Sequence, residues 1–480
     1  MVAQDDEIHE SGPEAAAAAG SPDGLRRLFE AHSVAVVGAS KDPDKWGYQV
    51  VRSILGGGFG GAVYPVNPRG GEILGLPVYE RLRNLPEPPD VVVVSLPATF
   101  VPAVIDEAAQ AGAGVLIVLA KGFREAGNAG LQDDMVAALG RHGLRLVGPN
   151  VMGLTFLPLR LNTMPWPCID VAGPLGVIGQ SGTVTAALAE WAADDGLGVS
   201  AILNTGNQAD VCEVDFLEAL DAEPSTRAIA LHVEGLHDGR RFLETLRALR
   251  KPVAVLKSGR STSGRRAAAS HTGSLAGRDE VFTGVCRQVG AIRAATLSDL
   301  YDSAKALATL GHSRGDRVLF LSTSGGSGAL AVDDAERRGL TVAQLPEGFI
   351  ESLRELGLAP ASSANPLDLD TESAADFETA GQLAIDRDVA DYIVLGFGDP
   401  IPGAARVAAR LAPQLPGGIV SYYLAGGDVQ RAESLAMHEA GIPVFPTPER
   451  AAHGIASCVH WTRAYRRRFA DAEARMRAGK

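Results

Sequence analysis

Apolar runs that end in small residues, each followed by a helical pattern, recur from residue 33 almost to the end of the 480-residue chain. The first is SVAVVGAS at 33–40, which precedes YQVVRSILGG, and later examples are PLGVIGQSG and VLFLSTSGG. Strands that alternate with helices form parallel sheets with helices on both faces. The pattern therefore predicts an α/β protein with doubly wound parallel sheets.

The length of the chain and the spacing of these units predict three domains, because a domain usually contains ~100–200 residues. We expect the domains at 25–150, 151–310 and 311–470, between an acidic, disordered segment at 1–24 and a C-terminal tail at 471–480. The second and third domains share the order apolar strand, Gly/Ser turn and helix. This shared order is a weak internal repeat.

Composition narrows the class of function. A net charge of −13 argues against nucleic acid as a partner. The four cysteines are scattered without zinc spacing, which is typical of a reducing cytoplasm. No apolar run reaches the ~18 residues that a bilayer requires. The acidic N-terminus does not resemble a signal peptide. We therefore expect a cytoplasmic protein with neither a membrane nor a metal site of its own.

The first turn, Gly38-Ala39-Ser40, follows a strand and should place a phosphate at a helix N-terminus. The fingerprint G-x-G-x-x-G is absent, and the second strand ends in Asn67-Pro68-Arg69, where NAD would require an acid. Arg69, with Lys45 and Lys121, suits a ribose phosphate instead. The turn therefore favours NADP or coenzyme A, and a structural turn without phosphate is the alternative.

Two further Gly/Ser turns precede helices in the second and third domains. Neither is a P-loop, because the terminal lysine is missing, and Thr183 rules out a nucleophile elbow after Ser181. A helix N-terminus carries about half a positive charge, so the two turns could hold a phosphoryl group between the domains. They could also serve only as tight turns. The residues concerned are Gly179, Gln180, Ser181, Gly182, Gly325, Gly326, Ser327 and Gly328.

The stretch from Lys257 to Gly277, KSGRSTSGRRAAASHTGSLAG, is unlike a core element. It surrounds His271 with cations and with Gly, Ser and Ala, so we expect a mobile basic loop that suits a polyanion. Imidazole is a nucleophile near neutral pH, since its unperturbed pKa is about 6.5. None of the other nine histidines has comparable surroundings, and His232 fits a core or strand end. His271 is therefore the candidate phosphoryl carrier.

Together these motifs resemble those of the NDP-forming acyl-CoA synthetases, relatives of succinyl-CoA synthetase. The resemblance spans about 25–466 and includes VVGAS with KDPDKWG, GPNVMG, GQSG, TGNQAD, VEGLHDGRRF, SHTGSLAG, SGGSG, NPLDL and IPVFPTPERA. SHTGSLAG is the most specific of these. The resemblance implies a Rossmann-like, CoA-binding first domain and two succinyl-CoA synthetase-like domains, the second of flavodoxin type.

The resemblance also implies a reaction: a carboxylic acid, CoA and NTP interconvert with acyl-CoA, NDP and phosphate through an acyl phosphate and a phosphohistidine. His271 matches the phosphorylated histidine, Glu234 matches the carboxylate that orients it, and the two Gly/Ser turns match the phosphate site. The acid substrate would lie near Asn150, Met152 and Asn207. CoA would be held by Gly38, Ala39, Ser40, Lys45, Asn67, Arg69, Ser95, Pro97, Lys121 and Gly122.

The family binds its nucleotide with an ATP-grasp domain, which fused members carry on the same chain. No such segment follows the third domain here, and Val151 stands where many relatives have cysteine after GPN. The resemblance is therefore to an alpha-type subunit of an ADP-forming acid–CoA ligase. ATP or ADP and Mg²⁺ would bind through a separate ATP-grasp (beta-type) subunit in a hetero-oligomer.

Two other functions fit parts of the sequence. A non-catalytic CoA- or acyl-CoA-binding protein would keep His271 as a relic, but the retention of Glu234 and of both glycine turns argues against it. An NADP-dependent oxidoreductase would need a catalytic lysine, or a Tyr-x-x-x-Lys pair, beside a nicotinamide. We find no convincing candidate for that role.

Overall fold

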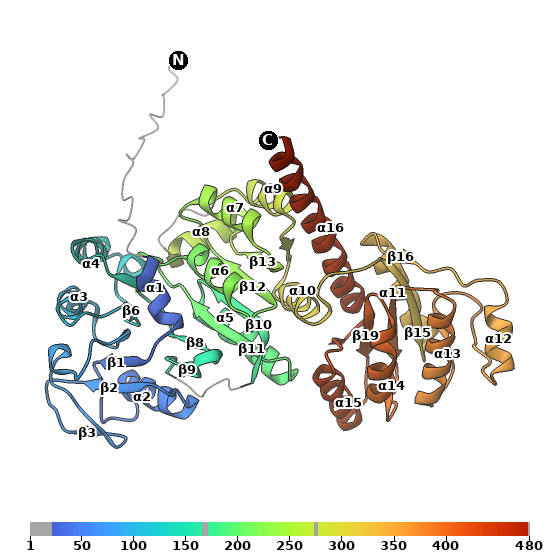
Figure 1. Cartoon of the computed structure of the whole chain (residues 1–480), viewed down its shortest axis with the longest axis horizontal. Coiled ribbons are helices and arrows are strands. Elements are labelled where there is room, and N and C mark those ends of the chain that lie inside the picture. Colours follow the sequence, from blue (N-terminus) through green and yellow to red (C-terminus); the bar gives the residue numbers. More distant parts are fainter. Residues whose placement is uncertain (1–21, 166–170, 273–276, 479–480) are drawn as a thin grey trace, which may run out of the picture.

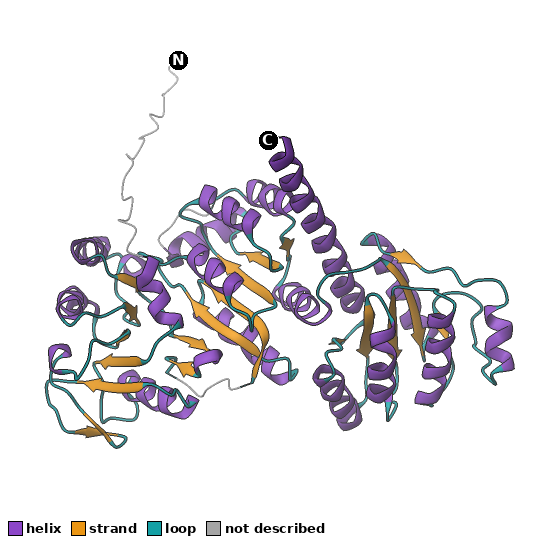
Figure 2. Cartoon of the chain, viewed as in Figure 1, coloured by secondary structure: helices purple, strands orange, loops and turns teal. Residues whose placement is uncertain are grey.

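The computed structural model describes residues 22–165, 171–272 and 277–478. Three sheets follow one another along the long axis of the molecule (Figure 1), and helices flank each sheet (Figure 2). The predicted α/β class with three parallel-sheet domains is confirmed. Most of the segment expected to be disordered, 1–24, lies outside the described residues.

The first sheet has the order β2-β1-β5-β6-β7, and all its pairs are parallel. Its central strands are apolar runs such as VVVV, as expected of strands buried on both faces. From β1 the chain passes to β2 on one side and later returns to β5 on the other. This reversal opens a crevice at the carboxyl ends of β1 and β5. The elements are α1 Pro22–Phe29, β1 Ser33–Val37, α2 Trp46–Gly57, β2 Ala62–Val66, the hairpin β3 Glu72–Ile73 and β4 Leu76–Pro77, β5 Val91–Val94, α3 Val101–Gln110, β6 Val115–Val118, η3 Arg124–Ala126, α4 Ala129–His142 and β7 Arg145–Val147.

The second sheet has the order β14-β13-β12-β10-β11-β8-β9. Its main strands are parallel, but β8 and β9 form an antiparallel hairpin at one edge. The sequence did not reveal this hairpin, because two strands of two or three residues show no periodicity. The elements are β8 Leu154–Phe156, β9 Leu161–Asn162, β10 Ala172–Gly179, α5 Gly182–Asp194, β11 Val199–Asn204, α6 Glu213–Ala222, β12 Ala228–Val233, α7 Gly239–Ala248, β13 Val253–Lys257, α8 Thr262–Thr272, α9 Asp279–Val289 and β14 Ile292–Arg293.

The third sheet has the order β16-β15-β18-β19-β20, and β17 also pairs with β15. The last helix runs to Ala478, so it includes most of the segment 471–480 that the sequence suggested as a tail. Its end is rich in Ala, Arg and Glu, which favour helix. The elements are α10 Leu297–Leu310, β15 Arg317–Ser322, α11 Gly325–Arg337, β16 Thr341–Val342, α12 Phe349–Glu355, β17 Leu367–Asp368, α13 Ala374–Asp386, β18 Tyr392–Phe397, α14 Ala404–Leu411, β19 Gly418–Tyr423, α15 Gly427–Glu439, β20 Val444–Phe445 and α16 Pro448–Ala478.

Hydrophobic cores join neighbouring sheets. One cluster contains both Val36 of the first sheet and Leu203 of the second. Another joins Val177 of the second sheet to Phe320 of the third, and it includes side chains from α10 and α16. Burial of shared apolar surface therefore fixes the relative positions of the three units.

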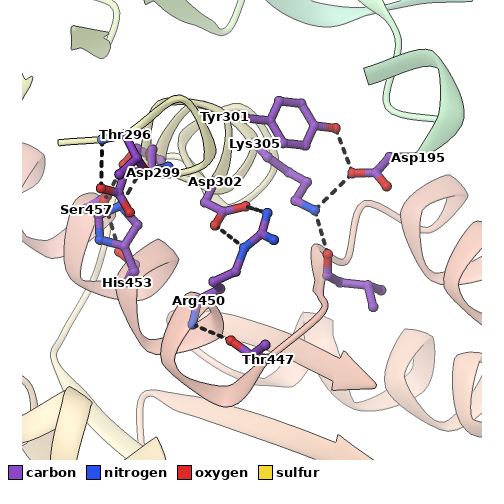
Figure 3. A network of polar contacts seen from close by, with 12 residues as sticks. Asp195, Thr296, Asp299, Tyr301, Asp302, Lys305, Thr447, Arg450, His453 and Ser457 are labelled. Carbon is purple, nitrogen blue, oxygen red and sulfur yellow. Dashed lines mark hydrogen bonds and ion pairs between the residues drawn. The ribbon is translucent and has the colours of Figure 1, made fainter. Parts of the chain in front are cut away.

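A polar network ties α10 to both neighbouring units (Figure 3). The buried Asp302 carboxylate accepts hydrogen bonds from Arg450 Nε at 2.6 Å and Nη2 at 2.8 Å. The buried Lys305 ammonium donates to Asp195 at 2.9 Å and to the Val444 carbonyl at 2.6 Å. Tyr301 also donates to Asp195, at 2.6 Å. Each buried charge has an opposite partner, so the network gives the junction of the second and third units one specific geometry.

Candidate active site

The turn after β1 is formed by close backbone contacts. Gly38 has a φ of +86°, and a Cβ at this position would lie 2.4 Å from the Ser95 carbonyl oxygen. The first turn of α2 also approaches it, because a Cβ on Gly47 would lie 2.0 Å from the Gly38 carbonyl oxygen. These contacts leave no room for a side chain at Gly38 or Gly47, so the backbone of the turn lies at the crevice between β1 and β5, as a site for a phosphate-bearing ligand requires.

The other residues predicted to bind CoA lie at the same edge of the first sheet. Asn67, directly after β2, donates from Nδ2 to the Ala39 carbonyl at 2.8 Å and accepts from the Arg69 amide at 3.0 Å. Ser40 accepts from the amide of Asp42 at 3.1 Å. Exposed side chains at this edge are Lys45, Arg69 and Lys121, and Ser95, Pro97 and Gly122 follow the strands β5 and β6.

A pair of glycines on α2 tests this geometry. Gly47→Ala should weaken CoA binding about 5- to 150-fold, because the new methyl group would displace the turn and overpacking typically costs ~1–3 kcal/mol. Gly56→Ala is the matched control, since nothing lies within 4 Å of a Cβ there. That variant should bind CoA normally and should be slightly more stable. Calorimetric titration measures the affinity of both variants for CoA. If the two variants bind CoA equally tightly, the turn is not part of the CoA site.

In the second unit, one side chain links the Gly/Ser turn to the segment after β12. Gln180 accepts hydrogen bonds at Oε1 from the amide of Glu234 and, at 3.0 Å, from the amide of Gly235. Its Nε2 donates to the Gly235 carbonyl at 2.7 Å and to Gln208 at 2.8 Å. Ser181 caps the N-terminus of α5. The structure therefore brings the turn Gly179–Gly182 and the buried Glu234 together.

Two buried residues that the sequence did not single out extend this contact. Gln208 donates to Glu213 at 2.6 Å and to Thr205 at 3.1 Å. Burial raises the pKa of Glu213 to about 7. Gln208 lies within the motif TGNQAD, which was the signal available in the sequence. A continuous chain of hydrogen bonds thus holds the backbone at Glu234 in place through Gln180.

The three residues predicted to contact the acid substrate lie where the first and second units meet. Asn150 donates to Asn207 at 3.2 Å, and Asn207 donates to Glu125 of η3. Burial opposes the ionisation of Glu125, but hydrogen bonds from the Gly122 amide, Asn207 and the Phe123 amide lower its pKa. The sequence had not indicated Glu125.

Met152 connects this junction to the Gly/Ser turn. Its backbone amide donates to Asn204 at 3.1 Å, and a Cβ on Gly182 would lie 2.1 Å from its sulfur. The thioether therefore lies against the N-terminus of α5. Asn150, Met152 and Asn207 therefore lie between the first unit and the turn Gly179–Gly182.

The stretch expected to be a mobile loop is helical over Thr262–Thr272, so His271 lies in the last turn of α8. Ser261 accepts from the amide of Gly264 at 3.0 Å, and the Arg- and Ala-rich sequence that follows favours helix. The helix contacts η3 of the first unit. The side chain of His271 and the residues 273–276 lie outside the described part of the chain.

His232 has the structural role that the sequence indicated. It lies within β12, is buried, and its Nε2 is 2.8 Å from Ser258 Oγ. Burial lowers its pKa to about 4, so this ring stays neutral at neutral pH. The neighbouring Lys257 is also buried and donates to the Ser258 carbonyl at 2.9 Å.

The turn of the third unit is capped in the same way but has different surroundings. Ser324 accepts from the amide of Ser327 at 3.4 Å, at the start of α11. A Cβ on Gly325 would lie 3.0 Å from an oxygen of Asp368, so a carboxylate is close to this turn. Among the described residues, no hydrogen bond or ion pair joins Gly325–Gly328 to Gly179–Gly182. Their convergence on one phosphoryl group stays a prediction.

Among the described residues, no group of three His, Cys, Asp or Glu side chains could hold a metal ion. No helix in the same ranges is both long enough and apolar enough to cross a membrane.

The chain matches two protein families, the CoA binding domain over 32–156 and the succinyl-CoA ligase like flavodoxin domain over 172–307. It is 34% identical over 465 residues to the alpha subunit of acetate–CoA ligase [ADP-forming] I from Pyrococcus furiosus, covering 92% of this chain and 98% of that subunit. It is 33% identical to acetate–CoA ligase [ADP-forming] I of Archaeoglobus fulgidus, covering 90% of this chain and 63% of that protein.

A solved structure of the dinucleotide forming acetyl-coenzyme A synthetase 1 from Ca. Korarchaeum cryptofilum, in complex with phosphate and ADP, is also similar. The TM-score is 0.86 at 32% sequence identity, over 93% of this chain and 98% of that one. The fold and these comparisons together define a homologue of CoA-dependent acid ligase subunits. The chain belongs to the NDP-forming acyl-CoA synthetase family, among the homologues of the ADP-forming acetate–CoA ligase alpha subunit.

Proposed function

We propose that the chain is the alpha-type subunit of an ADP-forming acid–CoA ligase that works through an acyl phosphate and a phosphohistidine at His271. The observation that carries this proposal is the contact between Gln180 and the backbone of Glu234 and Gly235, next to the junction with the first unit. This contact holds the N-terminus of α5 next to the backbone of the buried Glu234. Helix α8, which carries His271, contacts η3 of the first unit. We propose the domain boundaries 25–150, 151–310 and 311–470 for this subunit.

The first unit would bind CoA. Its glycine-lined turn would accept the pyrophosphate, and the exposed Lys45, Arg69 and Lys121 would neutralise phosphate charges. The thiol would then reach the boundary at Asn150, Met152 and Asn207, where the carboxyl group of the substrate would also bind. A small carboxylic acid is the expected substrate class, and acetate, named for the relatives, is the first to test.

The reaction can be written from acyl-CoA. A phosphate oxygen attacks the thioester carbonyl, the C–S bond breaks, and CoA leaves as a thiolate that takes up a proton. A ring nitrogen of His271 then attacks the phosphorus of the acyl phosphate, and the P–O bond breaks to release the carboxylate. An oxygen of the ADP β-phosphate attacks phosphohistidine, the P–N bond breaks, and ATP and free imidazole form.

Each proposed group has a defined role in these steps. The N-terminus of α5 at Gly179–Gly182 would stabilise the charge on the transferring phosphoryl oxygens. Glu234 would hold one ring N–H of His271, which fixes the tautomer and leaves the other nitrogen free to attack. Gln180 is a positioning residue, since it sets the backbone that carries Glu234.

The nucleotide step would take place on a separate ATP-grasp subunit, which would also supply ATP or ADP and Mg²⁺. The chain alone, given acyl-CoA and phosphate, should phosphorylate His271 slowly. It should make acyl-CoA from acid, CoA and ATP only when the partner is added, and the two should form a hetero-oligomer. Turnover of acid and ATP by the purified chain alone would contradict this division of labour.

A further inference from the structure

A cleft of about 770 Å³ lies between the second and third units, at the edge where their strands begin. Its lining comes mainly from the residues just before β12, β13, β15, β19 and β20, from the end of α10 and from α16. The glycine turns and Glu234 follow the carboxyl ends of parallel strands and so lie at the opposite edge. The cleft is therefore not part of the proposed active site.

The cleft is strongly cationic. Its lining includes no Asp or Glu, although the chain as a whole has a net charge of −13. The basic residues that line it are Arg227, Arg250, Lys251, His312, Arg314 and Arg466. Like charges gathered in one cleft repel each other unless an anion neutralises them.

Backbone carbonyls hold several of these side chains, and Asp221 accepts hydrogen bonds from the backbone amides of Arg250 and Lys251 at 2.9 Å and lies near the Lys251 ammonium. Arg227 and Arg466 each donate to a backbone carbonyl at 3.3 Å, and Lys251 donates to the carbonyl of Leu220 at 2.7 Å. The five Arg and Lys side chains of the cleft make no ion pair with any described carboxylate. Carbonyl oxygens orient these groups but do not cancel their charge, so N–H donors remain for a ligand.

An aromatic side chain of α16 forms part of the lining. Trp461 of α16 lines the cleft, is 2% exposed, and its indole N–H has no hydrogen-bond partner in the described structure. The indole nitrogen is itself enclosed by the protein, so the donors open to a ligand are those of the arginine and lysine side chains. Guanidinium and ammonium donors of this kind suit phosphate oxygens.

We propose that this cleft binds a multivalent phosphate-bearing anion, either a free polyphosphate or the polyphosphate chain of a nucleotide. Several arginines fit such a ligand better than a single carboxylate, because each guanidinium offers a planar fork of donors to phosphoryl oxygens. The ligand would contact residues of both the second and third units. It would therefore favour the arrangement in which these units are held together across α10.

The test is calorimetric titration of the full chain with tripolyphosphate, with CoA added to fill its own site. The double variant Arg250→Glu/Arg314→Glu should weaken binding about tenfold or more, since two charge-assisted contacts become repulsive. Arg287→Glu is the matched control, because Arg287 is exposed on α9 outside the cleft. This variant should bind tripolyphosphate as tightly as the wild type. The milder double variant Arg250→Gln/Arg314→Gln removes the two charges without reversing them. It should also bind tripolyphosphate more weakly than the wild type, which would show that the loss of affinity does not come from misfolding.

Titrations with ATP and with adenosine separate the two sources of the ligand. If ATP binds more tightly than tripolyphosphate, and the double variant weakens both, the site recognises a nucleotide. Equal affinities for ATP and tripolyphosphate, with none for adenosine, assign it to the phosphate chain alone. The proposal is wrong if the double variant binds tripolyphosphate as tightly as the wild type, or if the wild type does not bind it.

Discussion

Replacing His271 by alanine is expected to reduce ligase turnover, in the presence of the ATP-grasp partner, to below about one part in 10⁴ of the wild-type rate. The imidazole would accept and release the phosphoryl group, and loss of a nucleophile leaves only the residual catalysis of the binding groups. CoA binding should be unchanged, because the residues of the CoA turn belong to the first sheet. Coupled assays of ADP formation and titration with CoA measure the two effects.

His142→Ala is the matched control for this experiment. His142 ends α4 on the surface and pairs with Asp106 at 2.8 Å, away from the glycine turns. Its replacement should leave turnover unchanged. If His271→Ala remains active after contamination has been excluded, another residue carries the phosphoryl group.

Replacing Glu234 by glutamine should have the next largest effect, about a 10²- to 10⁴-fold loss in the rate of phosphoryl transfer. The amide has the same size but no charge, so it would no longer stabilise the ring N–H of His271 or the cation that forms as the ring reacts. The backbone contacts of Gln180 do not depend on the carboxylate, so the local fold should persist.

The effect of Glu234→Gln can be separated from a purely structural one. Glu244→Gln on the exposed face of α7 is a control of the same chemistry, and it should retain full activity. The thermal unfolding midpoints of both variants should be close to that of the wild type. A Glu234→Gln variant that transfers phosphate at the normal rate would show that Glu234 does not orient the histidine.

The sequence predicted the sheets well because their strands are chemically uniform. Runs such as VVVV at 91–94 and VLIV at 115–118 are buried on both faces, and such strands read as continuous apolar runs. The turns that follow β1, β10 and β15 were also visible in the sequence, because small residues mark the change from strand to helix. The short antiparallel hairpin β8–β9 has no comparable signal.

The contacts within the candidate site could not be predicted from local sequence. Gln180 reaches Gly235 across 55 positions, and Asn207 reaches Glu125 across 82. The first pair depends on which strands of the second sheet are neighbours, and the second pair depends on how the first and second units are placed. No periodicity in the sequence records either. The role proposed for Glu234 came from the family resemblance, whereas the cations and small residues around His271 had already indicated a phosphoryl carrier.

The stretch around His271 shows how composition can mislead. Gly, Ser and Ala suggested a mobile loop, but Arg265, Arg266 and the following alanines favour helix, and Ser261 caps its start. The cationic cleft was equally invisible, because its arginines lie between positions 227 and 466. Only the folded chain brings them together.

The most direct test of the account is to locate the phosphoryl group. The chain is incubated with its ATP-grasp partner and ATP labelled at the γ-phosphate, and then digested under alkaline conditions and analysed by mass spectrometry. The account predicts one acid-labile, base-stable phosphoryl group on the peptide that contains His271. Phosphate on a different residue, or acyl-CoA synthesis without any phosphorylated form of this chain, would contradict it.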